Sequence, residues 1–227
     1  MLKSLVNLLF PVTCPGCDNV LQHNEVALCT TCRHGLPFTH HYKDAQNETA
    51  KKFLGRVELQ HASALLYFHK EGITQQLIHN LKYRGQQQVG KLMGEVYAPL
   101  LQEVDELKSV SHIIPIPLHP KKLRERGYNQ VAAFGRALAG GLSIPYNDQV
   151  LVRAAYNKTQ TKKNRELRGS IVNRSFVVQF NEAHHNTHFL LVDDVITTGA
   201  TLEACAKLLL GIPGARVSIV TIAYTHS

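Results

Sequence analysis

The sequence predicts an α/β protein with a central parallel sheet, preceded by a small cysteine-rich module. Apolar residues make up 44% of the 227 residues, which is enough for a hydrophobic core of ordinary size. From about residue 60 onward, apolar runs typical of strands alternate with helical patterns, as they do in parallel α/β sheets. Four of the five cysteines lie close to the N-terminus. We therefore expect one α/β domain with a small N-terminal module.

The N-terminal cysteines form two C-x-x-C pairs, each of which places two thiols on one tight turn. This pattern is typical of a structural zinc site in which the protein supplies all four ligands, and the metal would fold a segment too short to bury a core. Two disulfides or a redox-active pair are the alternatives. Residues 1–10 read poorly as a secretory signal, which favours a reducing compartment and zinc. The predicted ligands are Cys14, Cys17, Cys29 and Cys32.

The rest of the chain divides by composition. We assign residues 1–38 to an N-terminal helix and zinc ribbon, 39–60 to a polar linker, and 61–227 to the α/β domain.

No apolar run reaches the roughly 18 residues of a membrane span, so we expect a soluble, cytoplasmic protein. Periodicity predicts strands at 62–68, 113–117, 189–192 and 217–223, and helices at 73–81, 89–106, 131–138 and 202–210. Residues 158–169 have no apolar face and are predicted to be a polar loop.

The positive charge is concentrated in one quarter of the chain. The net charge is +8 overall, whereas residues 119–174 hold twelve Lys or Arg and three acidic residues. Such an excess favours a polyanionic ligand at this segment, and a solvated basic face is the alternative.

The most informative stretch joins the strand at 189–192 to the helix at 202–210. Asp193 and Asp194 follow the strand at its carboxyl end, where open α/β sheets bind ligands. A turn of small and hydroxyl-bearing residues then opens the helix, and free N–H groups at a helix N-terminus favour phosphate. Carboxylates beside such a turn can accept hydrogen bonds from sugar hydroxyls. The turn comprises Thr197, Thr198, Gly199, Ala200 and Thr201.

The stretch from Phe189 to Thr201 resembles the phosphoribosyl pyrophosphate (PRPP) motif of type I phosphoribosyltransferases. The resemblance implies a type I phosphoribosyltransferase-like fold and Mg²⁺ bound together with PRPP. It also implies that Asp193 and Asp194 hold the ribose hydroxyls and that the turn at 197–201 holds the 5-phosphate. Two further segments fit that family. The pyrophosphate loop would include Leu118, His119, Lys121 and Lys122, and a flexible loop at 159–168 would bring Lys162, Lys163 and Arg165 to the reaction.

The order of these pieces resembles the ComF (ComFC/GntX-like) family of competence proteins over nearly the whole chain. The matching motifs are the two C-x-x-C pairs, Leu81-Lys82-Tyr83-Arg84-Gly85, Pro115-Ile116-Pro117-Leu118-His119, Arg126-Gly127-Tyr128-Asn129-Gln130, Thr159-Gln160 and the PRPP motif. The resemblance implies natural transformation, in which imported single-stranded DNA is handled beside a helicase-like partner. We expect the DNA phosphates to be held by Lys121, Lys122, Arg124, Arg126, Lys162, Lys163, Arg165 and Arg168.

Two tyrosines beside basic residues are candidates for stacking on DNA bases. Tyr83 and Tyr128 both occupy such positions, and core packing is the alternative for at least one of them.

Three functions remain open from the sequence. The first is a PRPP-binding protein that handles single-stranded DNA in natural transformation, with or without phosphoribosyltransferase activity. The second is a metabolic phosphoribosyltransferase that joins a base or an amine to ribose 5-phosphate. The third is a zinc-ribbon adaptor whose PRPP site is a sensor without turnover. The sequence identifies no segment that would recognise an acceptor.

Overall fold

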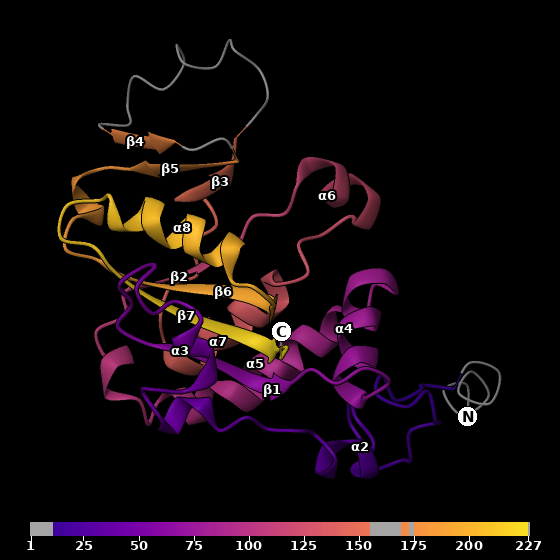
Figure 1. The fold of residues 1–227 in the computed structure, drawn as a ribbon. Helices are drawn as coiled ribbons and strands as arrows, with labels where there is room; N and C mark the ends of the chain where they lie inside the picture. The colour runs from indigo at the N-terminus through magenta and orange to yellow at the C-terminus, as the bar shows by residue number, and fades with distance from the viewer. Residues whose placement is uncertain (1–10, 155–168, 173–174, 227) are drawn as a thin grey trace.

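The structure, a computed structural model of the chain, describes residues 11–154, 169–172 and 175–226 (Figure 1). Its centre is a four-stranded sheet with the order β1-β7-β6-β2, in which every neighbouring pair is parallel. The strands are β1 (Ala62–Tyr67), β2 (His112–Pro115), β6 (His188–Ile196) and β7 (Arg216–Tyr224). The parallel sheet predicted from the alternating pattern is confirmed.

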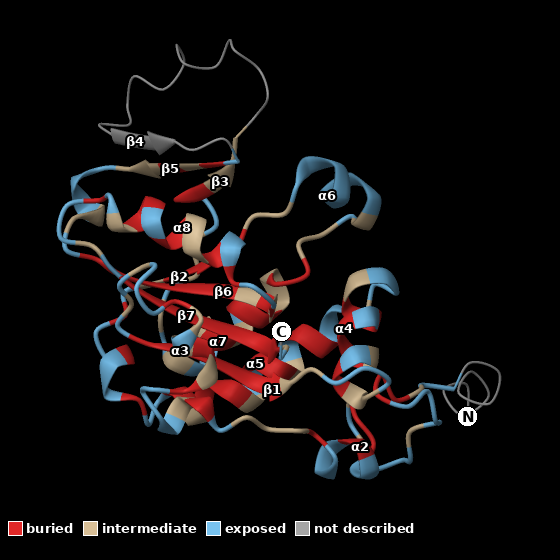
Figure 2. Ribbon diagram, in the orientation of Figure 1, coloured by how far each residue is buried: buried red, intermediate tan, exposed pale blue. Residues whose placement is uncertain are grey.

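Helices cover both faces of this sheet, which explains why its strands are apolar at successive positions. Leu190 and Val192 of β6 pack in one core with α4 (Ile73–Tyr83), α5 (Gln87–Leu101) and α7 (Ala132–Leu142). Phe189 and Leu191 point the other way and pack with α8 (Ala200–Leu210). Figure 2 shows the strands of the sheet buried along most of their length.

Close packing of α5 against α7 depends on glycine. A Cβ atom at Gly94 would lie 2.6 Å from the Cβ of Ala137, and one at Gly141 would lie 2.4 Å from the Cβ of Ala98.

Short 3₁₀ helices η2 (Asp105–Leu107) and η4 (Glu182–His184) lie in the connections that lead into β2 and β6.

A second, antiparallel sheet lies at one end of the molecule (Figure 1). Its order is β3-β5-β4, with β3 (Leu151–Arg153), β4 (Gly169–Val172) and β5 (Phe176–Phe180). These short strands were not predicted from the sequence. The predicted flexible loop falls between β3 and β4, and its candidate residues Lys162, Lys163, Arg165 and Arg168 lie outside the described residues.

The segment at 39–60 packs along β1 instead of crossing open solvent. It contains η1 (His41–Lys43) and α3 (Glu48–Lys51). The side-chain amide of Asn47 donates to the carbonyl of Ala62 at 2.8 Å, and Phe53 is 2% exposed within the core on the α8 side of the sheet. The expectation of a polar linker missed these contacts because a few buried residues in a polar segment leave no periodic pattern.

Two elements near the predicted site also differ in extent from the prediction. Strand β6 continues through Ile196, so both aspartates lie within the strand and not beyond its end. Strand β2 ends at Pro115, and a short helix α6 (Pro120–Arg126) follows it. Figure 2 shows α6 almost wholly exposed.

Within residues 11–38, the described part of the N-terminal module, there is one short helix, α2 (Thr30–His34), and the module packs against α4. Residues 1–10, where the predicted N-terminal helix would fall, lie outside the described residues. The predicted architecture, a central parallel sheet preceded by a four-cysteine module, is therefore confirmed. Among the parts of the chain that the structure describes, every helix is too short or too polar to cross a membrane.

Candidate functional site

Asp193 and Asp194 are consecutive residues near the carboxyl end of β6. Asp194 is 4% exposed, and its Oδ1 lies 3.0 Å from Nζ of Lys82 at the end of α4. Its other oxygen, Oδ2, is buried and has no hydrogen-bond partner among the residues that the structure describes. Asp193 is half-buried, and its Oδ1 accepts a hydrogen bond from the backbone N–H of Asp194 at 2.8 Å. A buried carboxylate oxygen without a donor is costly, so this geometry favours a ligand that donates to it.

The two carboxyl groups differ in their electrostatic surroundings. Burial raises the pKa of Asp193 well above its ordinary value, and the charge of Asp194 raises it further. The backbone N–H of Asp194 and the charges of Lys82 and Arg153 lower that pKa by smaller amounts. Burial and the neighbouring charge of Asp194 therefore both favour the protonated form of Asp193 by raising its pKa.

The predicted phosphate turn follows β6 directly. Gly199 caps the N-terminus of α8 with φ of +74°, a conformation that favours glycine. Thr197, Thr198, Ala200 and Thr201 are all exposed. The turn therefore exposes hydroxyl side chains at the N-terminus of an eleven-residue helix, which suits an anion. The backbone N–H of Ala200 donates to Oγ1 of Thr198 at 3.4 Å.

The segment at 39–60 supports this turn from behind. A Cβ at Gly199 would lie 3.1 Å from the ring of Phe53. Nη1 of Arg56 donates to the carbonyl of Thr198 at 3.1 Å, and its Nη2 forms an ion pair with Glu203 of α8. Arg56 was not predicted from the sequence because its partners are far away along the chain.

The predicted pyrophosphate loop lies beside β6 on the β2 side. The backbone N–H of Ile116 donates to the carbonyl of Val192 at 3.0 Å, so the chain leaves β2 next to the aspartates. His119 then caps α6 by accepting from the N–H of Lys121 at 3.2 Å. Leu118 is half-buried, whereas Lys121, Lys122 and Arg124 are exposed.

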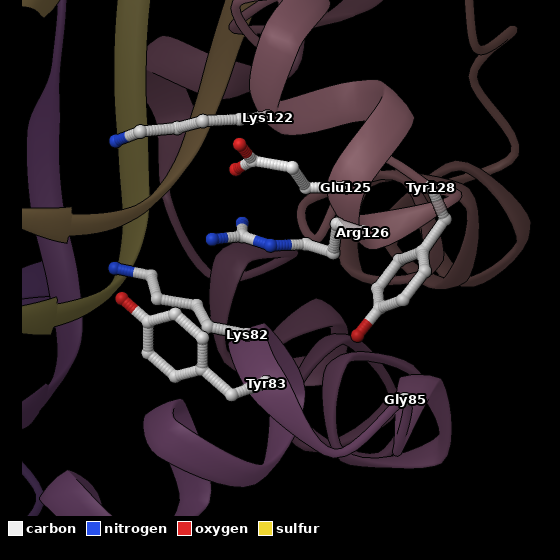
Figure 3. A pocket seen from close by; sticks show the side chains of 7 residues that line it. All are labelled: Lys82, Tyr83, Gly85, Lys122, Glu125, Arg126 and Tyr128. Atoms are coloured by element: carbon white, nitrogen blue, oxygen red, sulfur yellow. The ribbon is translucent and has the colours of Figure 1, made fainter.

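Helices α4 and α6 enclose a basic cavity of about 220 Å³, which we call the cation pocket (Figure 3). It is lined by Lys82, Tyr83, Gly85, Lys122, Glu125, Arg126 and Tyr128. The charged ends of Lys82, Lys122 and Arg126 point to the same side of the pocket in Figure 3. The fold therefore joins Lys82, which was not among the predicted site residues, to two predicted cations and to Asp194.

The two candidate stacking tyrosines have different surroundings. The hydroxyl of Tyr128 donates to the carbonyl of Leu81, so this ring connects the loop after α6 to α4. Tyr83 is 70% exposed, and the guanidinium of Arg126 lies 5.5 Å from its ring centre. Tyr83 is therefore available to a base, whereas Tyr128 has a structural role.

Arg153 is a second cation near the site that was not predicted from the sequence. Its guanidinium lies 4.1 Å from the ring centre of Phe176, and its Nε donates to the carbonyl of Pro117 at 3.2 Å. Burial lowers its pKa, while the nearby thiol of Cys205 and the carboxyl of Asp193 raise it. Arg153 therefore links the strand that precedes the predicted flexible loop to the predicted pyrophosphate loop.

The four N-terminal cysteines converge as a metal site requires. Their Sγ atoms all lie within 4.8 Å of one another, and the cysteines are free of disulfides. Sγ of Cys17 and Cys29 are 3.7 Å apart, close to the roughly 3.8 Å edge of a tetrahedron with Zn–S bonds of about 2.3 Å. Backbone N–H groups of Gly16 and Cys29 point at Sγ of Cys14, at 3.4 and 3.3 Å, as suits a thiolate. The four cysteines therefore fit Zn²⁺ as a donor set. The fifth cysteine, Cys205, is buried in α8 as predicted.

Comparison with known proteins agrees with this interpretation of the N-terminus. Residues 5–43 match the double zinc ribbon domain family. The chain is 28% identical to the DNA utilization protein YhgH of Salmonella typhimurium over 149 residues, which is 63% of each protein. It is 30% identical to competence protein F of Haemophilus influenzae over 59% of this chain and 60% of that protein. It is 25% identical to competence protein ComFC of Bacillus subtilis over 87% of this chain and 77% of that protein.

These relatives confirm the resemblance to the ComF family. The matched part of this chain spans 63% of the length of YhgH. Among solved structures, adenine phosphoribosyltransferase from Saccharomyces cerevisiae is similar with a TM-score of 0.39 and 17% identity, covering 63% of this chain and 72% of that one. The adenine phosphoribosyltransferase from Thermoanaerobacter pseudethanolicus has a TM-score of 0.40 and 17% identity, and the match covers 61% of this chain and 82% of that one.

Proposed function

We propose that this protein binds Mg²⁺–PRPP at the carboxyl end of β6 and handles single-stranded DNA in natural transformation. The single observation that carries the PRPP part is the buried, unpartnered Oδ2 of Asp194, which lies one residue from Asp193 and three residues before the phosphate turn. A ribose diol supplies two hydroxyl donors at adjacent carbons, and a carboxylate pair is a suitable acceptor for them. A phosphate on the same sugar reaches the turn at 197–201.

The remaining parts of PRPP meet suitable partners in this arrangement. The pyrophosphate group carries several negative charges, and Lys121 and Lys122 follow the loop that leaves β2 beside β6. The Mg²⁺ that accompanies PRPP would offset part of that charge. An ionised Asp193 is a stronger acceptor for a ribose hydroxyl than a protonated one, so binding is expected to strengthen as the pH rises through the raised pKa of Asp193.

Calorimetric titration with Mg²⁺–PRPP tests this site. Asp193→Asn with Asp194→Asn keeps nearly the same shape but removes the charged acceptors. Charge-assisted hydrogen bonds contribute roughly 1.5–3 kcal/mol each, so the double variant should bind at least about tenfold more weakly. Asp105→Asn, on the exposed 3₁₀ helix η2, is the matched control and should bind like the unaltered protein. Equal affinity in a folded double variant would place PRPP elsewhere or reject it.

The nucleic-acid part is supported by the exposed face of α6 and by the names of the relatives. Helix α6 buries none of its residues, and its cations Lys121, Lys122 and Arg124 are exposed. Arg126 is half-buried at the end of the helix. The exposed ring of Tyr83 lies beside Arg126 and provides a surface on which a base can stack. Relatives named for competence and DNA utilization make single-stranded DNA the expected polyanion, and a helicase-like competence protein the expected partner.

Anisotropy of a labelled single strand, measured against salt concentration, tests this assignment. Changing Lys121, Lys122, Arg124 and Arg126 to Ala should lower the salt slope by about 3 if all four contact phosphates. Lys91→Ala with Lys108→Ala removes cations outside the cation pocket, on α5 and after η2, and should leave the slope nearly unchanged. A slope unaffected by the α6 changes would move the DNA path to another surface.

Whether the protein catalyses phosphoribosyl transfer is decided by a separate measurement. Release of pyrophosphate from PRPP in the presence of a base, an amine or a DNA end would assign transferase activity, with that acceptor identified. Tight PRPP binding without pyrophosphate release would assign a sensor.

A further inference from the structure

We propose that the cysteine ribbon (residues 11–38) acts through α4 to hold Lys82 against Asp194, so that metal at the cysteines supports the ligand site on the opposite side of the helix. In this proposal Asn80 and Lys82 are positioning residues. The ligand measurements below depend on the proposed function, whereas the ligand-free measurement does not.

The ribbon is fixed to α4 by a buried hydrogen bond. Asn80 is 0% exposed, and its Nδ2 donates to the carbonyl of Pro15 at 2.8 Å. Pro15 follows the ligand Cys14 directly, within the first C-x-x-C turn. The position of Asn80 is therefore tied to a turn whose shape depends on the bound metal.

Further contacts hold the first half of α4 and its end to the same module. Nε2 of Gln76 donates to Oδ2 of Asp18 at 3.0 Å, and Nη1 of Arg84 lies 3.4 Å from Oδ1 of the same carboxylate. Ile73, at the start of α4, is so close that a Cβ at Gly16 would lie 3.2 Å from its Cγ2 and one at Gly35 would lie 3.0 Å from its Cδ1. The module thus contacts α4 from one end to the other.

The ribbon and the α/β domain also share a core. Cys14, Cys29 and Cys32 belong to the same buried cluster as Leu77 and Leu81 of α4. Figure 1 shows α4 between the ribbon, marked by α2, and α6. A change in the ribbon is therefore transmitted to α4 by packed side chains and not by a flexible tether.

Lys82 lies on the other side of α4 from these contacts. At about 100° per residue, its side chain leaves the helix roughly 200° from that of Asn80, so one faces the ribbon and the other faces β6. Nζ of Lys82 is 3.0 Å from Oδ1 of Asp194, and this leaves Oδ2 of Asp194 for a ligand. A rotation or shift of α4 would break this ion pair and allow the carboxylate to turn.

A double-mutant cycle tests the coupling. Lys82→Gln and Asn80→Ala should each weaken Mg²⁺–PRPP binding, by about tenfold for Lys82→Gln, and the two together should weaken it no more than Lys82→Gln alone. Lys82→Arg should recover part of the affinity. His79→Gln, on the exposed side of the same helix, is the matched control and should bind normally. Losses that simply add would show that the ribbon does not act through Lys82, and would overturn the proposal.

Metal removal provides the complementary test without mutating α4. Chelation of the metal should weaken PRPP binding in the unaltered protein but not in Lys82→Gln. An equal loss in both proteins would also overturn the proposal.

A ligand-free measurement separates this inference from the proposed function. Hydrogen exchange at the last turn of α4 should speed up after chelation or in Asn80→Ala, and the Nζ signal of Lys82 in ¹⁵N spectra should lose its ion-paired position. Unchanged exchange and an unchanged Nζ signal would reject the inference even if PRPP binds. If these signals change but PRPP never binds, the coupling stands and the proposed function fails.

Discussion

Single residues determine the chemistry at the end of β6. Asp193 and Asp194 were predicted from the sequence because the strand, the carboxylates and the phosphate turn are consecutive. Lys82 and Arg56 were not predicted as site residues, since each reaches its partner across a long stretch of chain. Lys82 lies in the motif at 81–85 that resembles the ComF family, but the motif by itself assigned it no role. Local motifs thus predict the centre of the candidate site, and only the fold shows the cations around the two aspartates.

The raised pKa of Asp193 leads to a prediction about stability. A carboxyl whose pKa is higher in the folded than in the unfolded state binds more protons when folded, so it stabilises the fold less as the pH rises. Between pH 5 and pH 8, Asp193→Asn should therefore gain stability relative to the unaltered protein. The gain should be at least about 1.4 kcal/mol, the free energy of one pKa unit.

Urea unfolding of both proteins at the two pH values measures this difference. The buried histidines titrate in both proteins and cancel from the comparison. A difference that does not change between pH 5 and pH 8 would show that Asp193 is ionised like an exposed aspartate. Asp105→Asn is again the matched control, and its stability difference should not grow with pH in this range because Lys108 lowers the pKa of Asp105.

At the scale of elements, strong patterns were predictive and weak ones were not. The apolar strands β6 and β7 and the helix α8 were found at their predicted places. The strands are buried on both faces and the helix on one, so each has a regular pattern of apolar residues in the sequence. Strands β3 and β5 are short, and η1 and α3 occur in a polar segment, so neither group leaves such a signal. Tertiary contacts, such as the burial of Phe53, define these elements instead.

The ribbon is the element whose stability depends on a metal. We expect the purified protein to hold about one zinc ion per chain, because four cysteine Sγ atoms converge within 4.8 Å of one another. Cys29→Ser should lose the metal and destabilise residues 12–38. Cys205→Ala, in the buried face of α8, should keep it. Elemental analysis and circular dichroism measure both effects, and a reduced preparation without zinc would contradict the assignment.

At the scale of the whole molecule, the described cations of α4 and α6 meet at the cation pocket. The cation pocket joins α6 to Lys82 beside the end of β6, and the predicted flexible loop carries four more cations in the sequence. If single-stranded DNA and PRPP use these cations together, saturating PRPP should change the affinity for DNA, and DNA should change the affinity for PRPP by the same factor. Anisotropy with and without PRPP, and calorimetry with and without DNA, measure the two factors. DNA binding that ignores PRPP would assign the two ligands to separate surfaces.

A crystal structure of the protein with Mg²⁺ and PRPP tests most directly whether the end of β6 is a PRPP site. We predict that the ribose hydroxyls lie within hydrogen-bond distance of Asp193 and Asp194, that Oδ2 of Asp194 gains its missing donor, and that the 5-phosphate rests on the turn at 197–201. A ligand bound elsewhere, or a site that stays empty at saturating PRPP, would contradict this prediction.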